Sequence, residues 1–341
     1  TTVRINELLT HTDPPLEDAI ELHNPTTQEI NLSGWYLSDA LDDLKKFRIA
    51  DGTLLPAGQF RVFYEYQFNG GSGSLTPFLL DSVRGESLYL SATDAAGNLT
   101  GYRTVVRFGA TANGVSLGHY RTSVSDDFVA MSARTFGVDQ PASVNAFRAG
   151  GGLPNAYPLV GPLVISEIMF QPVTGEGAAA VEIPEDEYLE LHNSSTSPAP
   201  LFDPNYPTNR WRFTDGVEFE FPPNVSLAPN GYLLVVSFDP TTAPNLLAEF
   251  RAKYSVPESV PIFGPFLGRL DNAGEPLALS RPDRPQQPPQ PDAGYVPYLE
   301  VERLAYAPTA PWHLAAPGSS LQRINAAAYG NDPVNWLTAV P

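Results

Sequence analysis

Paired acidic side chains are the first residues in this sequence that could perform chemistry. Glu7 is followed by Glu21, and Glu167 by Glu190, each inside a short apolar run. Two facing carboxylates would suit the acid–base hydrolysis of a glycoside. Because a carboxylate inside an apolar strand needs hydrogen-bond partners, the favoured interpretation is a structural acid that ties neighbouring segments together. The pairing also occurs twice, as a scaffold feature would, whereas an active site usually survives in one copy of a duplication.

Histidine, serine and cysteine offer no other catalytic pattern. The histidines are His11, His23, His119, His192 and His313, and their spacing is not that of zinc ligands. No Gly-x-Ser-x-Gly elbow is present, and the absence of cysteine excludes disulfides, thiolate metal sites and cysteine nucleophiles. We therefore expect no enzyme activity, and we expect His23 and His192 to bond backbone groups at strand ends.

Acidic loops allow a calcium interpretation. One cluster follows the first tryptophan strand, and another fills a loop in the second half of the chain. Their carboxylates belong to Asp39, Asp42, Asp43, Glu182, Glu185 and Asp186. Hard oxygen ligands of this kind suit Ca²⁺, although the EF-hand pattern is absent and solvated acidic loops are the simpler interpretation. Calcium is the one cofactor considered, and no other is expected.

The composition favours strands and argues against nucleic-acid binding. The chain has 341 residues, with 35 prolines and 27 glycines that separate short apolar runs. Prolines at this density suit turns between strands and disfavour long helices. A net charge of -18 repels phosphate backbones. No apolar run reaches the roughly 18 residues that a membrane-spanning helix needs.

An internal repeat organises the chain. Six blocks occur in the same order in both halves: 3–7 with 163–167, 20–24 with 189–193, 35–39 with 211–215, 55–63 with 227–236, 81–90 with 271–279, and 114–117 with 318–321. The duplication predicts one domain over residues 1–148 and a second over 161–341. The glycine-rich stretch 149–160 is expected to be a short flexible linker between them.

The second half carries insertions. Residues 174–187 lengthen its first loop, 202–210 interrupt the pattern before Trp211, and 281–297 form a proline-rich hairpin tip. Residues 241–254 have the one helical pattern in the chain. There Thr242 could cap the helix and Pro244 suits its first turn, and one face is apolar.

Tryptophans divide into expected core and expected surface residues. Trp35 and Trp211 lie in apolar strands of both halves, which predicts that both are buried more deeply than Trp312. Trp312 and Tyr298 lie near proline-rich loops and are candidates for an exposed platform that could stack on a sugar.

The repeated blocks resemble those of the lamin tail domain (LTD) family. In the first half the resemblance rests on Ile5-Asn6-Glu7, Glu21-Leu22-His23-Asn24, Leu32-Ser33-Gly34-Trp35 and the Leu-Pro-Ala-Gly turn at 55–58. It covers nearly the whole chain, in two copies. The resemblance implies an immunoglobulin-like β-sandwich in each half. The expected fold class is therefore all-β, with two tandem sandwiches and one short helix inserted in the second. The resemblance also implies kinship with exported bacterial proteins.

Together these features predict a non-enzymatic structural or adhesion module, secreted or on a bacterial cell surface. Its partner would be a protein or a cell-surface polysaccharide, with no nucleic acid and no membrane insertion. One alternative is a calcium-assisted carbohydrate-binding module, and another is an accessory domain pair of a larger exported hydrolase or nuclease. Because the second half has no counterpart of residues 135–145, we also expect the natural polypeptide to continue past Pro341.

Overall fold

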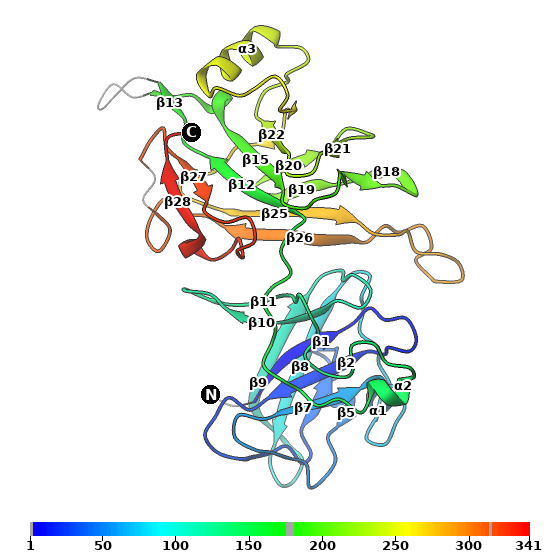
Figure 1. The fold of residues 1–341 in the computed structure, drawn as a ribbon. Helices are drawn as coiled ribbons and strands as arrows, with labels where there is room; N and C mark the ends of the chain where they lie inside the picture. The colour runs from blue at the N-terminus through cyan, green and yellow to red at the C-terminus, as the bar shows by residue number, and fades with distance from the viewer. Residues whose placement is uncertain (1–2, 175–180, 314–315) are drawn as a thin grey trace. The chain divides into compact units, whose positions relative to one another are not determined.

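Short strands joined by turns make up both halves of the chain (Figure 1). The computed structural model describes residues 3–174, 181–313 and 316–341. Contacts divide the chain into a first unit, Thr1–Arg121 with Asp126–Leu159, and a second unit, Thr122–Ser125 with Val160–Pro341. Nearly all strand pairs are antiparallel, and the expected all-β fold class is confirmed.

The first unit is a sandwich of two sheets. One sheet has the order β11-β10-β1-β2-β7, the other has the order β5-β4-β8-β9, and a β3-β6 ladder accompanies them. The strand bounds in chain order are β1 Arg4–Leu9, β2 Ala19–His23, β3 Ile30–Asn31, β4 Tyr36–Ser38, β5 Phe47–Arg48, β6 Leu54–Leu55, β7 Phe60–Tyr64, β8 Glu86–Thr93, β9 Leu99–Phe108, β10 Ser116–Arg121 and β11 Asp126–Ala130.

The second unit has the same two-sheet plan. Its sheets have the orders β23-β22-β15-β12-β27-β28 and β24-β20-β19-β25-β26, and β13-β14, β16-β21 and β17-β18 form short ladders. The bounds are β12 Leu163–Met169, β13 Val173–Thr174, β14 Val181–Glu182, β15 Tyr188–Asn193, β16 Ala199–Pro200, β17 Phe202–Asp203, β18 Tyr206–Arg210, β19 Arg212–Asp215, β20 Val217–Glu220, β21 Ser226–Leu227, β22 Tyr232–Val236, β23 Ile262–Phe263, β24 Leu267–Gly268, β25 Pro276–Pro282, β26 Tyr298–Ala305, β27 Ser320–Arg323 and β28 Trp336–Ala339. Short 3₁₀ helices cover Pro184–Asp186 and Pro333–Asn335.

Strand order and register agree between the two units. In the second unit β12, β15, β22, β27 and β28 take the places of β1, β2, β7, β10 and β11. Glu7 lies opposite Glu21, and Glu167 lies opposite Glu190, each just after a β-bulge in the first strand of its unit. The sequence repeat is therefore also a structural repeat, in which even the extra residue of the β-bulge occupies the same position in both units.

A buried asparagine closes the loop after the second strand of each unit. Asn24 Nδ2 donates to the backbone carbonyls of Gln28, Leu55 and Pro56 at 2.8, 2.9 and 3.1 Å. Asn193 Nδ2 makes the same three bonds, to the carbonyls of Ser197, Leu227 and Ala228. Because one amide holds both the loop and the turn, the His-Asn block and the Leu-Pro-Ala-Gly-like turn recur together in the sequence.

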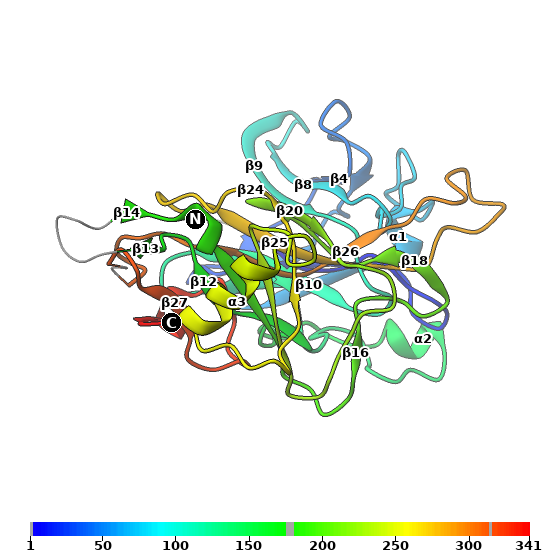
Figure 2. The same ribbon diagram turned by 90° about the horizontal axis from the view of Figure 1, so that it is seen from above.

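The outer face of the first sheet is covered by unrelated segments in the two units. In the first unit Phe136 and Phe147 pack on Leu9 and Tyr64. In the second unit Phe250 and its neighbours on helix α3 (Pro244–Lys253) pack on the equivalent strand positions, among them Met169 and Val236. Figures 1 and 2 show α3 lying along this sheet. The same apolar face thus exists in both units, and each unit excludes water from it by its own means.

The helix expected in the second half is present, with two differences. It covers Pro244–Lys253 and has Pro244 in its first turn, but Ala243 rather than Thr242 occupies the N-cap position. The expectation of a single helix is wrong, because the one-turn helices α1 (Glu65–Phe68) and α2 (Val144–Phe147) form in the first unit. Four residues are too few to give a helical period in the sequence. Among the described residues, no helix has the length and apolar character needed to cross a membrane.

Tryptophans lie in the core of both units. Trp35 is 9% exposed and Trp211 is 6% exposed, so both pack between the sheets as expected. The expectation that both are more buried than Trp312 is wrong, since Trp312 is also only 6% exposed. Its ring packs against Trp336, with centroids 5.8 Å apart. The loop that carries Trp312 folds back onto the core, which removes a large apolar ring from water.

Replacing Trp312 with alanine is therefore expected to lower the free energy of unfolding by about 3–5 kcal/mol, the range for emptying a large aromatic site. Trp35→Ala and Trp211→Ala should cost a similar amount. The measurement is urea unfolding followed by circular dichroism, with Leu267→Ala as the control, because Leu267 is 64% exposed. A Trp312→Ala chain as stable as the control would contradict the core assignment.

Candidate binding site

Two carboxylates face each other across β1 and β2 of the first unit, and both are 0% exposed. Glu7 accepts hydrogen bonds from the backbone N–H and the hydroxyl of Thr135. Glu21 Oε1 accepts from Asn6 Nδ2 at 2.7 Å. Because the bulge inserts one residue into β1, Asn6 and Glu7 both meet the chain that follows β11: Asn6 contacts Asn155, and Glu7 contacts Thr135.

The glycine-rich stretch after α2 lies directly over these acids. A Cβ atom at Gly152 would overlap Glu21 Oε2 and the Cβ of Phe60, and one at Gly150 would overlap the backbone of Gly137. In the segment that sequence analysis treats as a flexible linker, these glycines permit close packing on the first unit. Burial raises the pKa of Glu21 to about 8; the Asn6 hydrogen bond lowers it and the charge of Glu7 raises it.

The second unit repeats the arrangement with different partners. Glu167 Oε1 accepts from Tyr188 Oη at 2.8 Å and from Ser320 Oγ at 2.5 Å. Glu190 Oε1 accepts from Ser166 Oγ at 2.7 Å, and burial raises the pKa of Glu190 to about 7. The structure brings both predicted pairs together, and a scaffold donor binds at least one oxygen of each acid, although Glu21 Oε2 is buried without a partner within the described residues. This arrangement supports the interpretation of these side chains as structural acids.

A further buried acid precedes the second strand of each unit. Asp18 Oδ2 accepts from the backbone N–H of Leu80 at 3.1 Å, and Glu187 Oε2 accepts from that of Leu270 at 2.9 Å. Burial raises the pKa of each to about 7. Each acid therefore ties its strand to the chain that leads into the opposite sheet.

The carboxylates expected to bind calcium lie in different settings. Asp39 forms an ion pair with Lys46 at 2.7 Å, and Asp186 forms one with Lys253 at 2.5 Å. The others are exposed or half-buried: Asp42, Asp43, Glu182 and Glu185. Within the described ranges, no three His, Asp or Glu side chains gather in a way that could hold a metal ion. Residues 175–180 of the second acidic loop lie outside the described residues, and calcium binding stays a prediction.

The repeated histidines stack on aromatic rings. His23 lies 4.3 Å from Phe60 between ring centroids, and His192 lies 4.3 Å from Tyr232. His192 Nδ1 contacts the carbonyl of Gly231 at 3.2 Å, which agrees with the expected backbone bond. His23 differs, because its Nδ1 is buried without a hydrogen-bond partner among the described residues. Burial lowers the pKa of His23, and the charge of Arg4 lowers it further.

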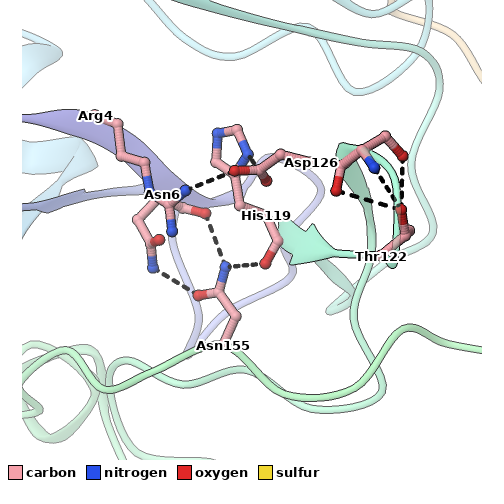
Figure 3. A network of polar contacts seen from close by, with 7 residues as sticks. Arg4, Asn6, His119, Thr122, Asp126 and Asn155 are labelled. Carbon is pink, nitrogen blue, oxygen red and sulfur yellow. Dashed lines mark hydrogen bonds and ion pairs between the residues drawn. The ribbon is translucent and has the colours of Figure 1, made fainter. Parts of the chain in front are cut away.

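A pocket of about 550 Å³ opens beside His23 on the outer face of β1, β2, β7 and β10. Its lining includes Arg4, His23, Phe60, His119, Arg121 and Tyr157. Asn155 completes one wall: its Nδ2 donates to the carbonyls of Asn6 and His119, and its Oδ1 accepts from Asn6 Nδ2 (Figure 3). These bonds hold the segment around Asn155 against the sheet. The pocket lies where this segment crosses the strands.

Two of the lining side chains, Arg4 and His119, are linked through Asp126, which is not itself a lining residue. Arg4 Nη1 lies 2.9 Å from Asp126 Oδ2, and His119 Nδ1 lies 2.8 Å from Asp126 Oδ1 (Figure 3). Burial lowers the pKa of His119, although Asp126 opposes the shift. Because the pKa of His23 and that of His119 are both lowered, the positive charge of the pocket at neutral pH resides on Arg4 and Arg121.

Sequence reasoning did not identify this pocket. Its lining residues come from five separate stretches of the chain, and no motif joins them. The aromatic platform that was expected elsewhere is not free: Trp312 is buried, and the guanidinium of Arg212 lies 3.4 Å from the ring centroid of Tyr298. One usable signal was the difference between the repeats, since Arg4 occupies the position that Val164 takes in the second unit.

Fold and site together define a tandem β-sandwich with a cationic, aromatic-lined pocket on its first unit. Residues 1–107 match the family model described as Lamin Tail Domain, so the resemblance predicted from the sequence is confirmed over this part of the chain. No curated protein matches the chain significantly. Among solved structures, the chain is similar to a DUF4876 family protein from Bacteroides thetaiotaomicron, with 9% identity and a TM-score of 0.35 over 100% of this chain and 96% of that one.

The buried acids should make stability depend on pH. The pKa of Glu21 is about 8 in the folded state, whereas a glutamate in the unfolded chain titrates near about 4.3. Between these values the folded state holds a proton that the unfolded state has lost. The free energy of unfolding therefore falls as pH rises through this window, by up to about 1.4 kcal/mol per pH unit for this one group.

We expect Glu21→Gln to remove that part of the slope, because the amide keeps a neutral acceptor for Asn6. The measurement is urea unfolding at several pH values across the window. Glu29→Gln, on an exposed loop of the same unit, is the matched control and should retain the wild-type slope. A Glu21→Gln profile parallel to the wild type would show that this carboxyl is not the titrating group.

Proposed function

We propose that the chain is a non-enzymatic binding module of a secreted or cell-surface bacterial protein. The observation that carries the proposal is the use of the repeated acids. Glu7, Glu21, Glu167 and Glu190 are held by scaffold donors in both units, and none of them lines the pocket. The pocket instead offers guanidinium, imidazole and aromatic groups, which suit recognition of a ligand.

Carbohydrate binding is the second candidate. The pocket favours it because Phe60 and Tyr157 lie beside polar groups in one concave site, which is the usual composition of a small-ligand site. Calcium assistance has no support in this pocket, since no carboxylate lines it. Attachment to a polysaccharide would be compatible with a surface or adhesion role.

The proposal is tested by two assays on the purified full chain. We expect saturable co-sedimentation with insoluble bacterial cell-envelope material, and no turnover of glycosides, esters or phosphodiesters. A structurally unrelated acidic protein of similar net charge sets the non-specific background. Retention no greater than this background would contradict the binding role. Turnover that is lost in Glu7→Gln or Glu190→Gln would contradict the non-enzymatic assignment.

A further inference from the structure

The outer-face pocket of the first unit has the size of a ligand site and no ligand assigned to it. Its volume of about 550 Å³ lies within the range of small-ligand sites. All its lining residues belong to the first unit. The site is therefore complete within one unit, and its ligand can be inferred from the groups that line it.

The charge of the pocket is opposite to that of the chain. The net charge of the chain is -18, yet the lining holds Arg4, Arg121, His23 and His119 and no carboxylate. Asp126 pairs with Arg4 and His119, while Arg121 is exposed and has no ion-pair partner within the described residues. A cationic spot in an acidic surface attracts a single anionic group, whereas the surrounding negative charge repels duplex nucleic acid, which carries one charge per about 1.7 Å of helix axis.

Two buried polar atoms on residues that line the pocket lack partners. Arg4 Nε and His23 Nδ1 are both buried and accept or donate no hydrogen bond within the described part of the chain. A buried polar atom without a partner is costly, so a ligand oxygen that reached these atoms would recover hydrogen bonds. The two atoms lie on paired residues of β1 and β2, because Arg4 is opposite His23 in the register.

Aromatic side chains border the charged groups. Phe60 stacks on His23, and Tyr157 is 43% exposed and packs edge-on against Tyr120. A ring with one apolar face and a polar rim suits such surroundings better than a bare inorganic anion does. Carboxylate-bearing sugars combine an apolar C–H face with a single negative charge on each residue.

Comparison with the second unit distinguishes the groups that are particular to the pocket from those of the common scaffold. It repeats the histidine stack as His192 on Tyr232, but Val164 replaces Arg4 opposite that histidine. Arg323 occupies the position of His119 and forms a buried ion pair with Glu302. The stack is thus part of the common fold, whereas an arginine opposite the stacked histidine occurs in the first unit and a valine in the second.

We propose that this pocket binds a uronic-acid residue of an acidic polysaccharide, with the arginines holding its carboxylate and the aromatic side chains packing on its ring. The inference rests on the proposed function, since it names the ligand class of the binding module. It predicts that recognition requires both the negative charge and the sugar ring.

The test is calorimetric titration of the full chain with short oligosaccharides of galacturonate, glucuronate or mannuronate. Each acid is compared with its methyl ester, which keeps the ring and removes the charge, and with inorganic phosphate. Arg121→Gln is the principal variant because Arg121 is exposed, and Arg107→Gln on β9 is the matched control. We expect at least one acid to bind, and we expect its methyl ester and the Arg121→Gln chain to bind about tenfold more weakly or worse.

The control Arg107→Gln should bind like the wild type. Equal binding of an acid and its ester, equal losses in Arg121→Gln and Arg107→Gln, or phosphate binding as tight as that of the sugars would overturn the inference. Failure of all three acids would also overturn it. If no acid binds but the chain still co-sediments with envelope material, the binding role remains and must use another surface. If neither oligosaccharide binding nor co-sedimentation is seen, both the uronic-acid site and the binding role are contradicted.

Discussion

A pair of carboxylic acids buried across the first two strands constrains the path of the chain in each unit. An acid inside an apolar sheet needs donors, and the neighbouring strands have committed their backbone groups to the ladder. In the first unit the donors come from Asn6 at the bulge and from Thr135, which lies 128 positions after Glu7. Satisfying Glu7 therefore requires the chain after β11 to return across the sheet, and the path of that chain places Gly152 over Glu21.

The same constraint creates the space for a ligand. The returning segment is anchored by Asn155, whose amide bonds Asn6 and the backbone of His119. It covers the acids but leaves the edge around Arg4 and His23 partly open, and the pocket lies there. Some buried groups on these residues, such as Arg4 Nε, have no hydrogen-bond partner within the described residues. The proposed binding site and the scaffold thus share residues, since Asn6 bonds both Glu21 and Asn155, which lines the pocket.

Comparison of the two units distinguishes common scaffold from local specialisation. The asparagine that closes the loop, the bulge with its facing acids, and the histidine stack are present at equivalent positions in both units. The covering of the outer face is different, with Phe136 and Phe147 in one unit and α3 in the other. A shared apolar face can be covered by any segment of suitable shape, because burial of apolar area is not directional. The polar groups above that face are consequently free to differ.

The sequence by itself determined the all-β class, the duplication, the burial of Trp35 and Trp211 and the helix near 244–253, because each depends on local periodicity or on a repeated block. It also indicated that the paired glutamates are structural. Only the tertiary structure decided the burial of Trp312, whose partner Trp336 lies in another segment. The pocket was decided in the same way, since it joins side chains from position 4 to position 157 through hydrogen bonds that no spacing in the sequence encodes. Contacts between distant segments depend on how loops return across the sheets, and that return depends on which buried groups still need partners.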